Sequence, residues 1–393
     1  MNNPQAQVRI TPLMPPELIN AIISEVDSKQ ALLNLRLTSK LFREMVTPPA
    51  FRTFDIPMKS NATKLVADFL EAPHLVKFVH ELRVNAQEGT KAFGDVIKDR
   101  EGNDVVLYPD LDELAYHLTI SRIREIQGLV LTAVAGFTNV HTLCLYFPEM
   151  GQPGYPGWDE KKEGLTYNLG YHICEALRES HIKSTLQTLE IQCLPACAIL
   201  LNVLSSPSSS LTSLTITECL PKVYLRFSFW DLSTYPLLQH LHLSKVGITI
   251  KRRRSNDALQ TDLEAFLFRH RGSIKTVRLE ECLIAVTRVI PSFPRTWADV
   301  WRNVEENIPH LERFEFEPAP RNPLDVSSIS SDSGDYIGLS YGVYRSLPGA
   351  YFPLLLGERD RADRDFPSER DDGAAWEKLQ STLDERKKGS TGD

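Results

Sequence analysis

A short pattern of hydrophobic positions recurs eight times along the chain. In each copy apolar residues stand at the first, fourth and sixth positions, with mostly polar residues between them. Because side chains alternate across a β-strand, the fourth and sixth positions face one side and the third, fifth and seventh the other. The pattern predicts eight short strands, each with one buried and one polar face. The apolar positions are Phe51, Phe54, Ile56; Val79, Leu82, Val84; Val140, Leu143, Leu145; Leu186, Leu189, Ile191; Leu211, Leu214, Ile216; Leu238, Leu241, Leu243; Ile274, Val277, Leu279; and Leu311, Phe314, Phe316.

Segments with helical periodicity lie between these predicted strands. Apolar residues recur at three- and four-residue spacing in 65–70, 169–177, 259–267 and 297–308, and the stretch 110–135 is also helix-like. One irregular repeat is expected near residues 105–107. Strands and helices that alternate at such intervals predict a solenoid, in which each unit packs on the next. An α/β sandwich with coincidental strand patterns is the alternative.

Residues 13–46 form a separate helical unit by their pattern. Three short helices are expected: the first begins at Pro15 and Pro16, the second is capped by Asp27 or Ser28, and the third is capped by Thr38. Prolines 48 and 49 should end the third helix. A unit of about 40 residues rarely buries a sufficient core alone. Its apolar excess should therefore be covered by another protein, by the following domain, or by both.

This unit resembles an F-box domain, in the form found in fungal F-box proteins. The resemblance rests on Met-Pro-Pro-Glu-Leu at 14–18, on Ile22 and Val26, and on Leu-Arg-Leu-Thr-Ser-Lys-Leu-Phe at 35–42. It implies that the unit binds the Skp adaptor of a Skp–cullin–F-box ubiquitin ligase. An ordinary helical cap at the N-terminus is the alternative. The residues expected to contact the adaptor are Met14, Pro15, Leu18, Ile22, Leu32, Leu33, Leu35 and Phe42.

The strand and helix pattern that follows resembles the leucine-rich-repeat domains of fungal F-box proteins. Two copies carry cysteine at the ninth position, at Cys219 and Cys282, as the repeat consensus prefers. The resemblance implies an α/β (α+β) solenoid, in which a three-helix F-box precedes an irregular leucine-rich-repeat domain. The expected parts are the F-box at 11–50, the repeat domain at 51–317, a flexible linker or loop at 318–334, a capping segment at 335–357, and a charged, partly disordered tail with one short amphipathic helix at 358–393.

Charge and cysteine content narrow the class of protein. The formal net charge of -7 and the pI of about 5.9 argue against nucleic acid or an anionic membrane as a partner. The chain contains no run of 18 apolar residues, and its N-terminus lacks the apolar segment of a signal peptide. Six cysteines are too sparse for a secreted disulfide scaffold, so we expect a reducing compartment, cytoplasmic and/or nuclear. The basic run at 251–254 is either a nuclear-import signal, a contact for an acidic partner or a solvated loop.

The sequence contains no arrangement of residues that supports catalysis. Gly-Leu-Ser-Tyr-Gly at 338–342 matches the nucleophile-elbow pattern, but that fold needs a histidine after the serine and the last histidine is His310. His240 and His242 share one face of a predicted strand, without a third ligand for a metal. We therefore expect no catalytic residues, no cofactor and no metal.

These observations together predict a substrate adaptor without catalysis of its own. The F-box would dock the Skp adaptor, and the repeats would hold an unknown protein substrate on the polar face of the strands, so the mechanism is proximity. A non-ligase interaction scaffold, with the F-box-like helices as a solenoid cap, is the alternative. The residues expected to bind substrate are Tyr146, Trp158, His240, His242, Arg278 and Arg313.

Overall fold

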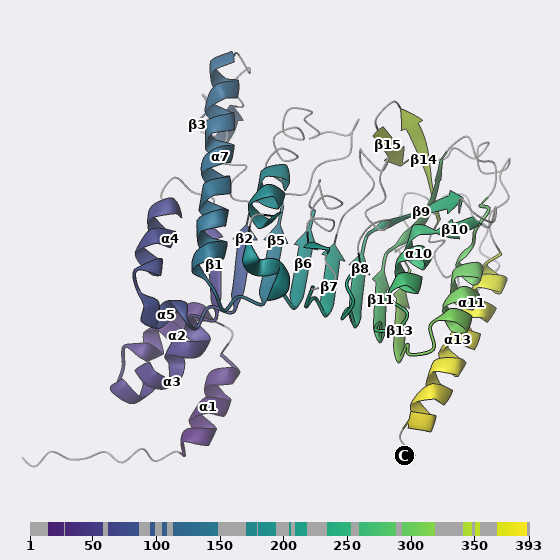
Figure 1. Ribbon diagram of the computed structural model, residues 1–393, viewed down its shortest axis with the longest axis horizontal. Helices are drawn as coiled ribbons and strands as arrows, with labels where there is room; N and C mark the ends of the chain where they lie inside the picture. The colour runs from purple at the N-terminus through teal and green to yellow at the C-terminus, as the bar shows by residue number, and fades with distance from the viewer. Residues whose placement is uncertain are drawn as a thin grey trace, which may run out of the picture.

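A row of parallel strands runs the length of the molecule, with a group of helices at the N-terminal end and a long helix at the other end (Figure 1). The structure is a computed structural model, and it describes residues 15–26, 28–57, 62–85, 95–98, 104–107, 113–147, 170–178, 180–193, 204–205, 209–217, 234–252, 259–287, 293–318, 341–347, 350–353 and 368–390. Among these residues, no helix combines the length and the apolar character that crossing a bilayer requires.

Three helices at the N-terminal end are α1 (Pro16–Ser24), α2 (Lys29–Arg36) and α3 (Lys40–Ala50). The Ser28 side chain accepts a hydrogen bond from the backbone N–H of Ala31 and caps α2, as one of the two residues we expected. Ser39 caps α3 in the same way, by accepting from the N–H of Phe42 at 3.2 Å. The predicted cap of this helix, Thr38, is wrong, because its hydroxyl donates to the carbonyl of the residue three positions earlier.

Helix α3 also passes through Pro48 and Pro49, where we expected it to stop. A proline within a helix removes its own N–H and crowds the carbonyl four residues earlier. The N–H of Phe51 still donates to the Thr47 carbonyl at 3.2 Å, so the last turn closes around the two prolines.

The eight predicted strands form one parallel sheet, and their order in the sheet follows the sequence. Neighbouring strands pair in register: Leu214, for example, lies between Leu189 and Leu241. The structure confirms both the strand positions and the alternation of buried and polar residues predicted from the repeated pattern. The strands are β1 (Thr53–Pro57), β2 (Glu81–Asn85), β5 (Thr142–Tyr146), β6 (Thr188–Gln192), β7 (Ser213–Thr217), β8 (His240–Ser244), β11 (Thr276–Glu280) and β13 (Arg313–Glu317).

Helices cover the apolar face of this sheet and form one continuous core with it. The predicted helical segments are confirmed, including the longest, α7, except that the helix expected over 259–267 begins only at Asp262, because residues 259–261 form a strand. Trp297 and Trp301 in α11 are both buried, with ring centroids 4.7 Å apart, so this pair packs the core as expected. The helices are α4 (Ala62–Leu70), α5 (Pro73–Val76), α7 (Glu113–Gly136), residues 170–178, the 3-10 helix η1 (His181–Ser184), α10 (Asp262–Arg269) and α11 (Trp297–Asn307).

Two smaller sheets interrupt the repeated pattern. β3 (Asp95–Lys98) and β4 (Asp104–Leu107) pair only with each other among the described strands, so the irregular repeat expected near 105–107 is wrong. The second sheet has the order β10-β9-β12-β14-β15. Two of its strands continue from the large sheet after a short turn: β9 follows β8, and β12 follows β11 (Figure 1). Its strands are β9 (Gly247–Arg252), β10 (Leu259–Thr261), β12 (Leu283–Thr287), β14 (Tyr341–Leu347) and β15 (Ala350–Pro353).

The turn after a strand has the same backbone conformation in three places. Cys193, Lys245 and Glu281 directly follow β6, β8 and β11, and their φ angles are 55°, 54° and 51°. A non-glycine residue in this left-handed region costs roughly 1–2 kcal/mol. In each case the backbone N–H donates to the last residue of the next strand, at 2.8–3.0 Å, which offsets part of that cost. The chain therefore leaves these three strands through the same type of turn.

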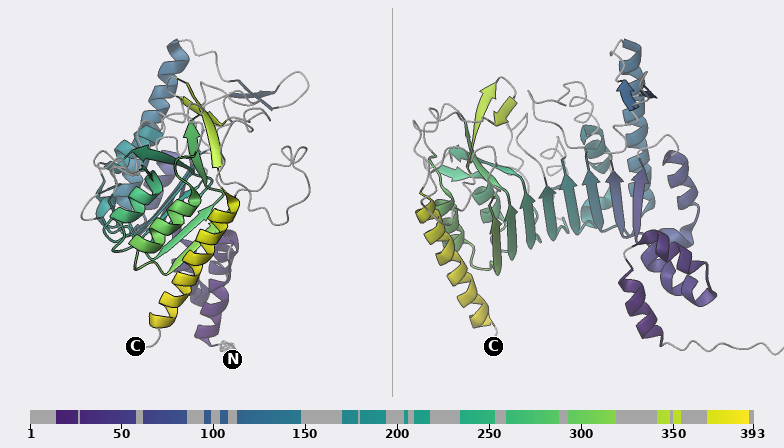
Figure 2. Two further views of the ribbon diagram at one scale, coloured as in Figure 1. Left: turned by 90° about the vertical axis from the view of Figure 1, so that its right-hand side faces the viewer. Right: turned by 180° about the vertical axis from the view of Figure 1, so that it is seen from behind.

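Helix α13 (Glu369–Ser390) covers the last strand of the large sheet and lies beside α11 (Figure 2). We expected 335–357 to form this cap, but its described residues supply β14 and β15 of the second sheet. Residues 369–390, which we assigned to a partly disordered tail with a short helix, form 22 residues of helix. The amphipathic pattern predicted for this segment explains why α13 packs on the core, since Leu379 and Leu383 on its apolar side are buried there.

Polar contacts at both ends of α11 fix α13 in place. Asp372 accepts a hydrogen bond from the backbone N–H of Ala298 at 2.7 Å, in the first turn of α11. At the other end, Arg386 donates to the carbonyls of Glu305 and Ile308 at 2.8 and 3.0 Å. A negative group at the start of a helix and a positive one at its end both complement the helix dipole.

His270 is a buried histidine that must be neutral to make its two hydrogen bonds. The backbone N–H of Tyr235 donates to its Nε2 at 2.9 Å, so its Nδ1–H donates to the Phe266 carbonyl at 2.8 Å. Burial, helped by the charge of Arg269, lowers its pKa from 6.5 to about 4, although the bond to Phe266 acts in the opposite direction.

We expect this histidine to make the protein less stable in mild acid. Between pH 6.5 and about 4 the unfolded chain takes up a proton that the folded chain does not, so stability is complete above that window and falls as the pH drops through it. From neutral pH to about pH 5 the loss is about 2 kcal/mol. Urea unfolding at the two pH values should show this loss in the natural protein and in an exposed-site control, His310→Gln, and a smaller one in His270→Gln. Equal losses in all three proteins would contradict the assignment.

Candidate functional site

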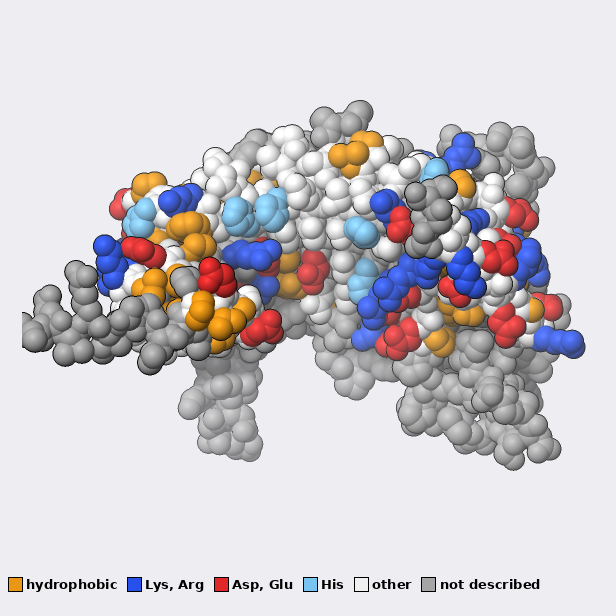
Figure 3. Space-filling view, turned by 90° about the horizontal axis from the view of Figure 1, so that it is seen from below, with side chains coloured by type: hydrophobic (Ala, Val, Ile, Leu, Met, Phe, Trp, Pro, Cys, Tyr) orange, Lys and Arg blue, Asp and Glu red, His pale blue; other side chains and the backbone are white. Residues whose placement is uncertain are grey.

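The first candidate surface lies on the three N-terminal helices. Their own core is small and consists of Ile19, Ile23, Leu32, Val46 and Ala50. Several large apolar side chains remain exposed around it: Leu18 and Ile22 at 54% each, Leu37 at 77% and Leu41 at 38%. Figure 3 shows hydrophobic side chains gathered at this end of the molecule. The helical unit therefore presents more apolar surface than it buries, as its pattern predicted.

The predicted adaptor contacts divide by exposure. Pro15, Leu18 and Ile22 are exposed and belong to this surface, which we call the helical surface. Leu33, Leu35 and Phe42 are partly buried, and Met14 lies outside the described residues. Leu32 is buried in the core of the unit, so here it supports the helices and does not face a partner. Leu37, after α2, and Leu41, in α3, are further exposed apolar side chains of the helical surface, and they were not among the predicted adaptor contacts.

A cluster of tilted aromatic rings connects this unit to the sheet. Phe51 lies after α3 and contacts Phe69 of α4, with ring centroids 5.9 Å apart. Phe54 of β1 lies between Phe69 and Phe137, at 4.8 Å from each. Lys29 of α2 adds a hydrogen bond to the carbonyl of Thr53 at 3.0 Å. The helices and the sheet thus share one packed junction.

The second candidate surface is the polar face of the large sheet, opposite the helices. In the right-hand view of Figure 2 the row of strands lies in front of the helices. Cross-strand pairing aligns the middle residue of every strand into one row along this face. In order, the row is Asp55, Arg83, Cys144, Glu190, Thr215, His242, Arg278 and Glu315. Charged groups therefore stand at both ends of this row, and between them Cys144 and Thr215 flank one carboxylate, that of Glu190.

The charged end holds four of the residues expected to bind substrate, together with acidic partners. His242 Nε2 lies 3.1 Å from a carboxylate oxygen of Glu280. Arg278 forms ion pairs with Glu280 and Glu315, and Arg313 pairs with Glu315. Both arginine side chains stay more than half exposed. Each of the two arginines that we expected to bind substrate therefore already has a carboxylate partner on the sheet.

These contacts change the ionisation of Glu280. Burial alone would raise its pKa, but the nearby His242 and Arg278 outweigh burial and lower it. His240 has a different partner, with its Nδ1 2.8 Å from the Thr276 hydroxyl. The sequence could have indicated Glu280 and Glu315, since both occupy polar positions on the strands next to the predicted histidines and arginine.

The centre of the face is less accessible than its polar sequence suggested. Tyr146 is partly buried at the end of β5, and burial raises its pKa. Cys144 lies between Glu81 and Glu190, and burial, with these carboxylates, raises its pKa to about 12. A thiol with that pKa is a poor nucleophile near neutral pH. Trp158, the remaining predicted contact, lies outside the described residues.

Within the described part of the chain, no group of three or more histidine, cysteine, aspartate or glutamate side chains is arranged to hold a metal. The two histidines of β8 have different partners, Thr276 and Glu280. The face therefore offers hydrogen bonds and charges for contact with another molecule.

The comparisons with known proteins identify the N-terminal unit. Residues 12–54 match the family model of the F-box domain. The chain therefore contains an F-box domain, the type of domain that binds Skp-type adaptors in cullin ubiquitin ligases. A search of the curated proteins finds no match.

Among solved structures, one similar chain is a sugar phosphate isomerase/epimerase from Parabacteroides distasonis. It is 9% identical, with 77% of this chain and 88% of that chain covered, and the TM-score is 0.23. At that score the similarity carries no argument about the fold or the activity.

Proposed function

We propose that this protein is a substrate-recognition adaptor of a Skp–cullin–F-box ubiquitin ligase, with no catalysis of its own. The F-box at 12–54 carries this proposal, together with the exposed Leu18, Ile22 and Leu37 of the helical surface. Exposed apolar side chains on a unit with so small a core are typical of a protein–protein contact. A compartment that contains the ligase, the cytoplasm or the nucleus, is part of the proposal.

The rest of the chain would be an irregular leucine-rich-repeat domain of the kind found in fungal F-box proteins. Three observations support this: the repeated apolar pattern, eight parallel strands in sequence order, and the shared left-handed turn after three of them. The lengths of the repeats differ because the second sheet and other segments are inserted between strands. The polar face of the sheet would then hold the substrate, through His240, His242, Arg278, Arg313 and Tyr146.

The mechanism would be proximity. The aromatic junction of Phe51, Phe54, Phe69 and Phe137 joins the F-box to the sheet without a flexible connection. A substrate held on the sheet would therefore stay at a set distance from the adaptor and from the ubiquitin-transferring part of the ligase.

Co-expression with a Skp-type adaptor tests this proposal. We expect the two proteins to co-elute as one complex in size-exclusion chromatography, because the adaptor covers the apolar helical surface. A well-folded protein that elutes alone in the presence of the adaptor would reject the ligase role and favour an interaction scaffold in which the helices only cap the sheet.

A further inference from the structure

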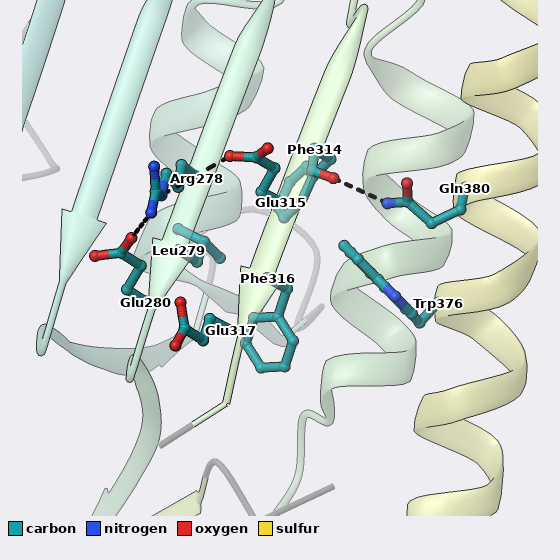
Figure 4. Close-up of a pocket in the computed structure, with 9 residues that line it drawn as sticks. All are labelled: Arg278, Leu279, Glu280, Phe314, Glu315, Phe316, Glu317, Trp376 and Gln380. Carbon is teal, nitrogen blue, oxygen red and sulfur yellow. Dashed lines mark hydrogen bonds and ion pairs between the residues drawn. The ribbon is translucent and has the colours of Figure 1, made fainter. Parts of the chain in front are cut away.

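A hollow of about 420 Å³ lies at the end of the large sheet, between β13 and α13 (Figure 4). Its lining comes from β11, β13 and α13, and it combines aromatic rings with charged groups of the polar face. Of the residues that the sequence predicted to bind substrate, only Arg278 lines this hollow. The hollow exists because α13 returns to cover the last strand.

The apolar wall of the hollow is held in shape by ring contacts. Trp376 of α13 and Phe316 of β13 have ring centroids 5.9 Å apart, and Trp301 lies beneath both at 5.2 and 5.0 Å. The nearby Gln380 side chain donates to the backbone carbonyl of Phe314 at 2.9 Å, which ties α13 to the edge of β13. The wall is therefore preformed and need not be ordered when a ligand enters.

The charged groups of the hollow are mostly acidic. Three carboxylates line it, those of Glu280, Glu315 and Glu317, against one guanidinium, that of Arg278. Glu280 and Glu315 share Arg278 and have further basic partners in His242 and Arg313. Glu317 is exposed and forms no ion pair within the described part of the chain. The hollow therefore has an acidic excess beside an aromatic wall.

We propose that this hollow binds a lysine or arginine side chain of the protein held by the sheet. The aliphatic stem of such a side chain packs on Phe316 and Trp376, while its cationic group meets Glu317 and the negative side of the ring. A neutral apolar side chain would leave the carboxylates unused, and an acidic one would be repelled. The inference rests on the proposed partner-binding role of the sheet and adds the chemistry of one residue in that partner.

Fluorescence anisotropy with short labelled peptides tests the proposal on the full-length protein. The probe is an extended peptide with arginine between valine and serine residues, and the matched probe has glutamine in place of each arginine. We expect saturable binding of the arginine peptide that weakens with added salt, and about tenfold weaker binding to Glu317→Lys. The control Glu306→Lys makes the same charge change at an exposed position of α11 and should bind as the natural protein does.

Three results would overturn the proposal: equal binding of the two peptides, unchanged binding to Glu317→Lys, or no saturable binding to the natural protein. Thermal unfolding of each variant, together with the milder Glu317→Gln, separates lost contact from lost folding. The measurement contains no Skp adaptor. Failure here with intact adaptor binding rejects only the basic-residue site, whereas failed adaptor binding rejects only the ligase role.

Discussion

Replacing Leu18 and Ile22 by aspartate should strongly weaken binding of the Skp-type adaptor. Both side chains belong to α1, both are 54% exposed, and they stand one helical turn apart on the helical surface. Removing a central apolar anchor from an interface costs about 2 kcal/mol or more. Together the two changes should weaken binding by a factor of about a thousand, because each 1.4 kcal/mol is about tenfold. Isothermal titration with the purified adaptor measures this loss.

The matched control for this experiment is Leu237→Asp. Leu237 is 53% exposed but lies far along the chain, just before β8, so it tests the general effect of aspartate at an exposed leucine. We expect unchanged adaptor binding and an unfolding free energy within about 0.5 kcal/mol, as for other surface positions. A substitution at Leu32 would be a poor test, because that side chain is buried and its loss would damage the helices themselves. Undiminished binding by the α1 variant would reject this helix as the docking surface.

Replacing Glu264 by glutamine should destabilise the protein by about 3–5 kcal/mol, as for other buried ion pairs that lose one partner. Glu264 in α10 is fully buried, and both its oxygens accept hydrogen bonds from Arg295. Asn303 of α11 donates to it at 2.6 Å, and the N–H of Thr261 at 2.8 Å. Glutamine preserves the shape and can keep the capping contact with Thr261. It removes the charge that balances Arg295, whose side chain is only 17% exposed.

Chemical denaturation of the variant measures this effect, with Glu306→Gln as an exposed control on α11. The double variant Glu264→Gln, Arg295→Gln should regain part of the lost stability, because the unpaired charge is then absent. If the single variant unfolds at the same denaturant concentration as the natural protein, Glu264 does not link α10 to α11 in the way that we infer.

Local pattern alone determined the strands of the large sheet and the face that each strand buries. A strand with apolar residues at two alternate positions can bury only one face, so the spacing of Leu189 and Ile191, and of their equivalents, set both the strands and the direction of each side chain. The N-cap residue of α3 was not determined by the pattern. Thr38 and Ser39 are neighbours with the same hydroxyl chemistry, and only the backbone path decides which side chain faces the first turn of the helix.

Contacts between distant segments were decided by the tertiary structure. Arg295 and Glu264 are 31 positions apart, and Arg386 and Ile308 are 78 apart. Neither pair has a spacing that a helix or a strand would produce. The hollow also depends on residues that are distant in the sequence, because Phe316 and Trp376, which both line it, belong to segments separated by a long stretch of chain. Periodicity indicates which face of a helix or strand is buried. Which other element covers that face depends on how the whole chain packs, and the local sequence pattern does not specify this.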